Sequence, residues 1–334
     1  MKRIISFAAT LALGSILFSS CMKDEKPYTK PPAPVSEGNF EIQNDKISIG
    51  EDYETQVYFS LTTGEVASSK FKAWDIAIAN KQDSVELWLN GGKKVLVYAT
   101  GLQNFAAITN IAAATGDKWR YDDPSGIAGQ SGLGLLADHI GEVLLVDDGE
   151  GTYFKMQITE ITSASYKLNV GTITDVTPGL VELERDENYN FAYYSFIDGV
   201  VKPEPPKQDW DLLFTRYRYI YRNYPTEGSD FPYYVNGVLS NPYKTQTWSD
   251  STKLYEFYDV LLSEAETKPL YNDRDKIGFN WKSANANTAQ YTVNKKRLFL
   301  IKDQNEALWK LRFVNFYDEN NVRGTPQFEF QRLK

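Results

Sequence analysis

The chain is poor in histidine and cysteine, the side chains that activate many catalytic nucleophiles and bind zinc. Its 334 residues include one histidine, His139, and one cysteine, Cys21. A Ser-His-Asp triad would have to use His139, but no Gly-x-Ser-x-Gly elbow accompanies it, and a Cys-His pair would need a free thiol. Structural zinc sites usually take several Cys or His ligands. The sequence therefore argues against nucleophilic hydrolysis and zinc chemistry.

Paired carboxylates are the remaining route to catalysis, because a glycosidase needs only two of them. Three groups qualify: Asp122-Asp123, Asp147-Asp148-Glu150 and Asp273-Asp275. Each group lies beside a turn signal, where carboxylates commonly accept hydrogen bonds from backbone amides. A calcium site at 147–150 would need further oxygen ligands that the sequence does not place. We expect a protein that is not an enzyme, with a glycosidase as the lesser hypothesis.

Three tyrosines, Tyr217, Tyr219 and Tyr221, alternate with other residues in one short segment. On a strand this spacing places all three on one face. The face is either a half-buried part of a sheet, which is the favoured interpretation, or a stacking wall for a flat ligand. Two Trp-Asp pairs, at 74–75 and 210–211, are interpreted as structural, with the Trp in the core and the Asp bonded to nearby amides.

From about residue 40 the sequence predicts short strands separated by turns, rich in Tyr, Phe, Val, Ile and Thr. Asn90-Gly91-Gly92 is typical of a hairpin turn, and so is the segment 147–151. Apolar residues at 3.6-residue spacing predict a helix over 254–265. The predicted class is mainly β with one or two short helices. The predicted strands are 46–49, 57–61, 74–78, 85–89, 94–98, 144–146 and 153–158.

A faint internal repeat divides the chain. Trp74-Asp75-Ile76 recurs as Trp210-Asp211-Leu212, 136 positions later, and Phe154–Ile158 recurs as Trp309–Phe313, 155 positions later. The unequal spacings indicate a degenerate duplication. Prolines between 203 and 206 would interrupt any β-ladder. These features predict a first β half at 41–202 and a second at 203–334.

Residues 1–20 have the layout of a secretory signal peptide. Lys2 and Arg3 precede an apolar run at 4–18, which is too short to span a bilayer as a stable helix. Phe18-Ser19-Ser20-Cys21 resembles a bacterial lipobox, in which the cysteine is acylated, for example with palmitate. Each buried CH2 contributes about 0.8 kcal/mol to membrane attachment. We predict lipidation at Cys21; the alternative is a secreted protein with an unmodified thiol.

Residues 21–40 predict a lipidated, flexible tether, because charged residues are followed by prolines. Lys23-Asp24-Glu25 resembles the signal that sends Bacteroidota lipoproteins to the outer face of the outer membrane; the alternative is a solvated linker. Without residues 1–20 the chain has 34 basic and 44 acidic residues, a net charge of −10. Such a charge argues against binding nucleic acid or an anionic lipid surface. No later apolar run could span a bilayer, so the lipid would be the only membrane anchor.

Several blocks of the sequence together resemble the HmuY family, over about residues 45–334. The most specific are Trp-Asp-Leu-Leu-Phe-Thr at 210–215 and Gly-Val-Leu-Ser-Asn-Pro at 237–242. The resemblance implies a β-rich outer-membrane lipoprotein with an antiparallel β-sheet fold in two related halves, similar to a longer, two-part subgroup. The other blocks are 74–78, 205–209, 309–313 and 324–328.

Characterised members of that family are haemophores, which bind haem and pass it to a TonB-dependent receptor. They hold iron between two axial side chains, histidine or methionine. In the predicted folded part only His139 and Met156 are of these types, so the resemblance implies them as haem ligands. The alternation of 154–158 and the alignment of Met156 with Leu311 favour core packing for Met156. A solvated or locally bonded role is favoured for His139.

The leading hypothesis is a surface-exposed, lipid-anchored outer-membrane protein that binds haem or a related porphyrin without catalysis. By resemblance it would deliver this ligand to a TonB-dependent receptor. The alternative is a binding or scaffold lipoprotein for a glycan or a protein partner, with no haem site.

Overall fold

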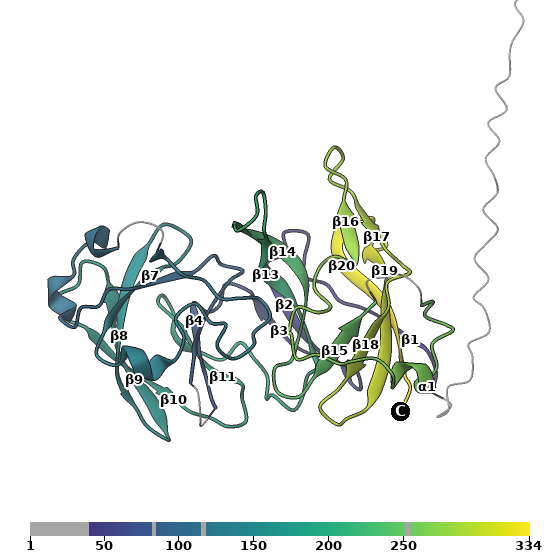
Figure 1. Ribbon diagram of the computed structural model, residues 1–334, viewed down its shortest axis with the longest axis horizontal. Helices are drawn as coiled ribbons and strands as arrows, with labels where there is room; N and C mark the ends of the chain where they lie inside the picture. The colour runs from purple at the N-terminus through teal and green to yellow at the C-terminus, as the bar shows by residue number, and fades with distance from the viewer. Residues whose placement is uncertain (1–39, 82–84, 115–117, 251–254) are drawn as a thin grey trace, which may run out of the picture. The chain divides into compact units, whose positions relative to one another are not determined.

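The computed structural model describes residues 40–81, 85–114, 118–250 and 255–334 (Figure 1). The predicted signal peptide, Cys21 and the segment Lys23-Asp24-Glu25 lie outside the described residues. All of these described residues belong to one compact unit. Within the described ranges, no helix is both long enough and apolar enough to cross a membrane.

The described part is mainly β, as predicted, and every ladder between two named strands is antiparallel. The strands of the described residues form two five-stranded sheets, two four-stranded sheets and one two-stranded sheet. The first five-stranded sheet contains, in order, β10 (Gly179–Glu184), β9 (Ser165–Thr172), β8 (Tyr153–Ile161), β7 (Val143–Asp147) and β6 (Leu96–Ala99). The second contains β1 (Gln43–Lys46), β20 (Arg323–Arg332), β19 (Leu308–Tyr317), β18 (Phe299–Lys302) and β15 (Gln246–Ser249).

The four-stranded sheets also come as a pair. One contains β12 (Gly199–Val201), β11 (Phe191–Ser195), β4 (Ile76–Ala79) and β5 (Leu87–Leu89). The other contains β3 (Gly64–Lys70), β2 (Thr55–Ser60), β13 (Leu212–Arg222) and β14 (Asp230–Ser240). The smallest sheet pairs β16 (Lys282–Ala284) with β17 (Tyr291–Val293). The described helices are α1 (Leu262–Ala265) and the 3-10 turns η1 (Phe105–Ala107), η2 (Ile111–Ala113) and η4 (Leu136–His139).

The two repeats exchange strands. In chain order β1–β9 correspond to β10–β15 and β18–β20, because both kinds of sheet have matching strand orders, and β16 and β17 have no counterpart among the described strands. However, β1 pairs with β20 and β2 with β13, whereas β10 pairs with β9 and β11 with β4. The first three strands of each repeat therefore complete the sheets of the other. The segment 43–70, which the sequence grouped with the first half, is built into the sheets of the second.

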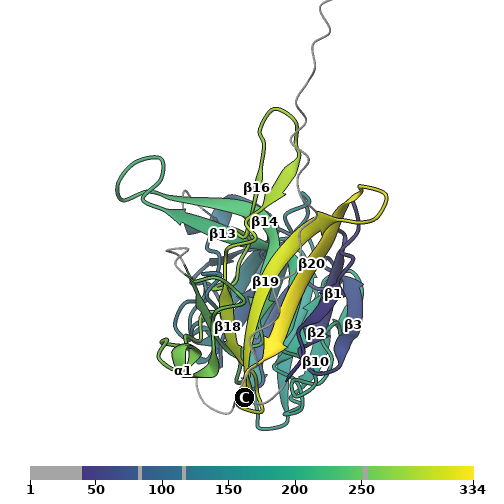
Figure 2. The ribbon, with the colours of Figure 1, turned by 90° about the vertical axis from the view of Figure 1, so that its right-hand side faces the viewer.

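The unequal spacings of the repeat have a structural cause. The offset is 136 residues between Asp75 and Asp211, and it rises to 151 between Asn90 and Asn241. Between these two points lies the β13–β14 hairpin, whose strands have 11 residues each, against 4 and 3 in β4 and β5. This longer hairpin is an addition to the second repeat, and it extends beyond its sheet in Figure 2.

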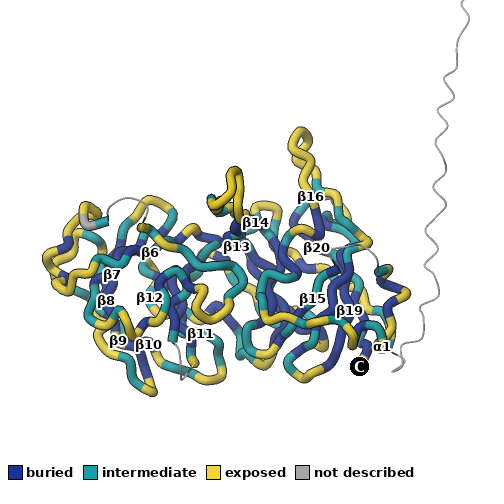
Figure 3. The backbone as a smooth tube through the Cα atoms, in the orientation of Figure 1, coloured by how far each residue is buried: buried dark blue, intermediate teal, exposed yellow. Residues whose placement is uncertain are grey.

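Each set of sheets has its own apolar core (Figure 3). Met156 and Leu311 occupy corresponding strands, and both are completely buried. Next to them the buried lysines Lys155 and Lys310 also correspond. Lys155 donates from Nζ to the Phe105 and Ile108 carbonyls, and Lys310 donates to the Val260 carbonyl at 2.9 Å. In both repeats a lysine thus ties an irregular segment to the sheet.

The helix predicted over 254–265 is wrong except for its last turn, α1. Residue 254 lies outside the described residues, and 255–261 are not helical. Phe257, Tyr258 and Val260 are all buried, and the Val260 carbonyl accepts the bond from Lys310. Positions 257, 258 and 260 cannot all lie on one narrow face of a helix, since successive residues are about 100° apart. Contact with the sheet therefore outweighs the helical pattern.

The hairpin predicted around 90–92 is also wrong, although the turn exists. β5 pairs with β4, and β6 pairs with β7 in another sheet. Asn90 Nδ2 donates to the carbonyls of Phe71 and Trp74. These bonds attach the turn to the segment before β4, so β5 and β6 do not form a hairpin. The second predicted hairpin, at 147–151, is confirmed by the pairing of β7 with β8.

Candidate functional site

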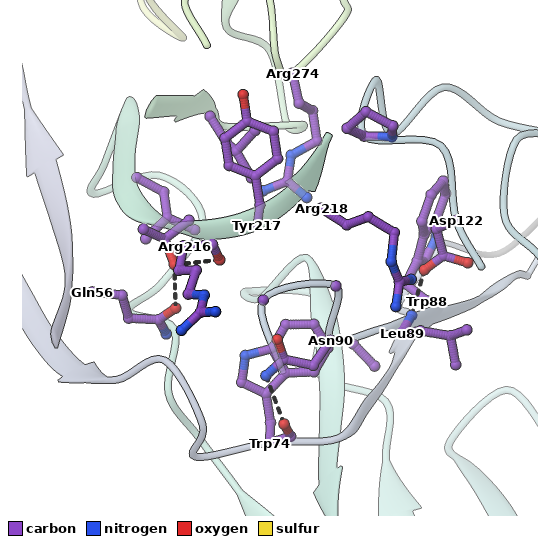
Figure 4. A pocket seen from close by; sticks show the side chains of 18 of the residues that line it. Gln56, Trp74, Trp88, Leu89, Asn90, Asp122, Arg216, Tyr217, Arg218 and Arg274 are labelled. Carbon is purple, nitrogen blue, oxygen red and sulfur yellow. Dashed lines mark hydrogen bonds between the residues drawn. The ribbon is translucent and has the colours of Figure 1, made fainter. Parts of the chain in front are cut away.

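A cavity lies between β13 and the turn that follows β5, where residues of both repeats meet (Figure 4). It contains about 780 Å³ of empty space, including a part open to solvent. The turn at 91–92 packs closely on β13: a Cβ atom on Gly92 would lie 2.4 Å from the Arg216 carbonyl oxygen. The absence of a side chain at Gly92 therefore sets the distance between the two walls.

Aromatic side chains form one wall of the cavity. Trp74 and Trp88 are both half-buried there, so part of each indole is accessible. Trp74 meets Tyr193 edge to face, with ring centroids 5.2 Å apart, and Tyr193 meets Phe191 in the same way at 5.8 Å. Packed, edge-to-face rings hold their orientation, which makes this wall a preformed surface for a flat apolar group.

Three arginines reach the same cavity from different segments: Arg216 and Arg218 from β13, and Arg274 from the loop before β16 (Figure 4). Arg218 is buried and donates to the Val95 carbonyl at 3.1 Å. Arg274 donates from Nε to the Ser240 carbonyl at 3.1 Å, and burial lowers its pKa. Arginine nonetheless stays protonated in proteins, so all three are cations.

The carboxylates of the cavity are already bonded elsewhere. Asp122 accepts the Leu89 amide at 2.5 Å and the Gly132 amide at 2.7 Å. Burial raises the pKa of Asp122 to about 7, against the opposing charge of Arg218. Asp123 forms an ion pair with Arg222. The cavity therefore has a local surplus of positive charge in a chain whose net charge is −8, which favours an anionic ligand.

A buried polar network supports the aromatic wall from behind. Glu204 accepts the Tyr193 hydroxyl at 3.0 Å and the Asn190 amide at 2.5 Å. Asn190 also bonds Asn241 at 3.1 Å, which connects the sheet that contains β11 to the end of β14 in the other four-stranded sheet. Burial raises the pKa of Glu204 to about 7, partly offset by these hydrogen bonds and by Arg274. Tyr193 is thereby fixed through its hydroxyl while its ring contacts Trp74.

The predicted haem ligands do not line this cavity. Met156 is completely buried in the core of the first five-stranded sheet. His139, at the end of η4, places Nδ1 2.6 Å from Glu142 Oε2 and Nε2 3.2 Å from the Leu133 carbonyl oxygen. Both ring nitrogens thus have partners within the fold. This geometry favours packing for Met156 and local hydrogen bonding for His139.

The three predicted stacking tyrosines have different environments. Tyr217 is buried and lines the cavity, and its hydroxyl has no hydrogen-bond partner among the described residues. Tyr219 packs edge to face on both Phe279 and Tyr221, with centroids 5.0 Å apart in each case. Tyr221 is exposed on the outer part of the hairpin, 6.2 Å from the Tyr233 ring. Tyr217 and Tyr219 therefore pack within the sheet, whereas Tyr221 contributes to an exposed aromatic surface on the same strand.

The predicted carboxylate groups serve the fold. Asp148 accepts the Glu150 and Thr152 amides at 2.8 and 2.9 Å, which closes the β7–β8 turn. Asp273 pairs with Lys276 at 3.1 Å. Among the residues that the structure describes, no three or more His, Cys, Asp or Glu side chains are grouped so as to hold a metal ion.

The sequence had not singled out Trp88, Arg218 or Arg274 as site residues. For the two residues of β13, Arg216 and Arg218, the alternation with tyrosines was a usable signal. Arg274 lies more than 50 positions further along the chain, and nothing in its local sequence associates it with that strand. Its role depends on the tertiary structure.

One protein family matches part of this chain. The HmuY protein family matches residues 187–330, which include β11 to β19 and most of β20. No curated protein matches the sequence.

Solved structures of similar proteins overlap with most of the chain at low identity. An apo HmuY analogue from Tannerella forsythia is 11% identical, with 88% of this chain and 96% of that chain covered and a TM-score of 0.25. Apo PinO from Porphyromonas gingivitis is 9% identical, with 88% and 98% covered and a TM-score of 0.26.

A protein from Bacteroides vulgatus, described as HmuY-like and haem-binding, is 11% identical, with 89% and 95% covered and a TM-score of 0.24. TM-scores of this size do not establish a common arrangement of the whole chain. The resemblance seen in the sequence is confirmed over residues 187–330, the part of the chain that matches the HmuY protein family.

Proposed function

We propose that this protein binds haem or a related porphyrin, without catalysis, in the cavity between β13 and the turn after β5. The observation that carries the proposal is the presence of three arginines beside a preformed aromatic wall. Porphyrins of this kind are flat, apolar rings with two carboxylates, so they need an aromatic or apolar surface and fixed cations. The match of residues 187–330 to the HmuY family supports the same ligand class.

The aromatic wall and the arginines of the cavity match the ring and the carboxylates of such a ligand, but no lining residue matches its iron. Its lining residues include no histidine and no methionine. Bound haem would bring the redox and ligand-binding chemistry of its iron, but this cavity supplies no axial pair of the type found in the family. We therefore propose recognition through the macrocycle, with Trp74 and Trp88 against the ring and the arginines toward its edge.

A titration of the chain from residue 22 with haem, and in parallel with iron-free protoporphyrin IX, tests this proposal. Saturable absorbance changes with both ligands, at similar affinity, are expected. Trp88→Ala should weaken binding at least tenfold, because it removes part of the ring contact. Trp248→Ala is the matched control, since Trp248 is also half-buried but packs on Tyr255 outside the cavity. Absence of binding for both ligands would overturn the proposal.

We further propose that the protein is anchored by lipid at Cys21 in the outer membrane, faces the cell exterior and delivers its ligand to a TonB-dependent receptor. The lipobox and the Lys23-Asp24-Glu25 segment support the first two points, and the family resemblance supports the third. Cys21→Ala should abolish labelling with a palmitate analogue. Replacing residues 23–25 by alanine should protect the protein from protease added to intact cells, and unchanged sensitivity would contradict the export role.

A second function is favoured by the outer part of the β13–β14 hairpin. Tyr224 and Tyr233 are 55% and 50% exposed there, and they adjoin Tyr221 and the 43% exposed Phe231. Exposed aromatic clusters mark binding surfaces. This surface supports the alternative of a scaffold for a glycan or protein partner. A Tyr221→Ala, Tyr233→Ala double variant should lose such binding while it retains porphyrin binding.

A further inference from the structure

We propose that Arg216 binds a carboxylate of the ligand and thereby gives the cavity its preference for acids over uncharged analogues. This inference rests on the function proposed for the cavity, and it assigns a specific role to one of its three cations. Arg216 is half-buried and lines the cavity, as Figure 4 shows.

The other arginines around the cavity already have acceptors. Arg218 and Arg274 donate to backbone carbonyls, as described above. Arg222, on the same strand, forms ion pairs with both Asp123 and Asp230. By contrast, the guanidinium of Arg216 makes no hydrogen bond or ion pair with any residue in the described part of the chain. Among the arginines of β13, Arg216 is therefore the one with no hydrogen-bonded or ion-paired guanidinium nitrogen in the described residues. Arg218 also has an unpaired Nε, but that atom is buried.

Two aromatic rings hold the Arg216 guanidinium in place. Its central carbon lies 5.5 Å from the centroid of Phe71 and 5.9 Å from that of Tyr234. A guanidinium beside aromatic rings keeps its N–H groups free at its edge, and these groups match the two oxygens of a carboxylate. Because the side chain is already restrained, little further rotational freedom would be lost on binding.

Two acidic side chains near the neighbouring cation Lys72 are paired with that lysine. Glu150 lies 2.7 Å from Lys72 Nζ and Glu54 lies 4.0 Å from it. The hydrogen bond from Lys72 to Glu150 raises the pKa of Lys72, and the positive charge of Arg216 acts in the opposite direction. Lys72 and Arg216 are therefore close enough to repel each other. An anionic group arriving beside Arg216 would relieve this repulsion as well as complete the guanidinium's hydrogen bonds.

The test compares protoporphyrin IX with its dimethyl ester, in the same detergent buffer, on the wild-type chain, Arg216→Gln and Arg297→Gln. Hydrogen bonds to charged groups predict that the wild type prefers the diacid by about ten- to a hundredfold. Arg216→Gln should lose this preference but bind the ester within about twofold of the wild type. Arg297→Gln is the matched control and should keep the wild-type preference, because Arg297 is also half-buried beside an aromatic ring, that of Phe299, but does not line the cavity.

The outcomes separate this inference from the function on which it rests. A wild type that binds neither compound overturns the proposed function. A wild type that binds both equally leaves that function standing and overturns the role of Arg216, as does an Arg216→Gln variant that still prefers the diacid. Arg216→Lys provides a further check, because a point charge without the planar fork should restore part of the preference and not all of it.

Discussion

Asp75 and Asp211 hold the same position in the two repeats, and each accepts a backbone amide from a segment of the other repeat. Asp75 Oδ2 is 2.7 Å from the Phe196 nitrogen, and Asp211 Oδ2 is 2.8 Å from the Leu61 nitrogen. Phe196 directly follows β11 and Leu61 directly follows β2, the exchanged strands. The Trp-Asp motif thus fastens each exchanged strand to its new sheet, which agrees with its interpretation as a structural element.

Replacing Asp75 should destabilise the protein more than replacing Asp211. Asp75 also forms a buried ion pair with Lys93 at 2.5 Å, whereas no cation in the described part of the chain forms an ion pair with Asp211. Asp75→Asn would leave the Lys93 charge buried without a counter-ion, at a cost of about 3–5 kcal/mol. Asp211→Asn keeps an oxygen that can accept the Leu61 amide, so we expect a loss of about 1–2 kcal/mol.

Urea denaturation measures both variants. Adding Lys93→Met to Asp75→Asn should recover a large part of the lost stability, because the unpaired charge is then removed as well. Equal losses for the two single variants would show that the Lys93 contact contributes nothing.

Stability should depend on pH through Glu204. Burial raises its pKa from 4.5 to about 7, so the folded protein binds more protons than the unfolded chain between these values. The free energy of unfolding should therefore fall as the pH rises from about 4.5 to about 7, and then level off. Glu204→Gln cannot titrate. Relative to this variant, the wild type should lose about 3 kcal/mol across that range.

Urea denaturation at pH 5, 6, 7 and 8 provides the measurement. Burial also raises the pKa values of Asp122, Asp211 and Asp275 into this range. These three groups are present in both proteins, so their contributions cancel in the stability difference. A stability difference that does not change with pH would refute a raised pKa at Glu204.

Met156 should behave as a core residue and not as an iron ligand. Met156→Leu should cost less than about 1.5 kcal/mol, because it conserves volume and the second repeat already has Leu311 at this position. Met156→Ala should cost about 2–5 kcal/mol through the cavity it creates. Thermal denaturation measures both. Porphyrin titrations of Met156→Leu and His139→Ala should match the wild type; a large loss of haem affinity in either would restore these residues as ligands.

Gly92→Ala should disturb the cavity directly. The new methyl group would lie 2.4 Å from the Arg216 carbonyl oxygen, so the turn must move away from β13. We expect a loss of stability of about 1–3 kcal/mol from overpacking and a clear decrease in porphyrin affinity. Gly179→Ala, where the nearest atom is 3.5 Å away, is the matched control and should leave the affinity unchanged. Equal behaviour of the two variants would argue against a fixed spacing of the cavity walls.

Several features of this protein follow from the sequence because they depend on local pattern. The alternation of apolar residues predicted a mainly β fold, and the Asp-Gly-rich segment at 147–151 predicted the β7–β8 turn, which Asp148 closes. The two Trp-Asp motifs revealed the duplication, and the alignment of Met156 with Leu311 predicted its burial. Each of these properties resides within a strand, a turn or a repeated motif.

The tertiary structure decided which strands pair and which side chains meet. Because the repeats are alike, the alternation in β1–β3 fits the sheets of either one, and only their contacts with β13 and β20 select the second. Apolar residues over 254–265 have helical spacing in the sequence, but 255–261 are not helical. Phe257 and Val260 are instead buried where they contact Lys310 of the sheet. Arg274 is brought to the cavity of Arg216 because its loop packs on the end of β14, where it bonds the Ser240 carbonyl, and no spacing in the sequence encodes that contact.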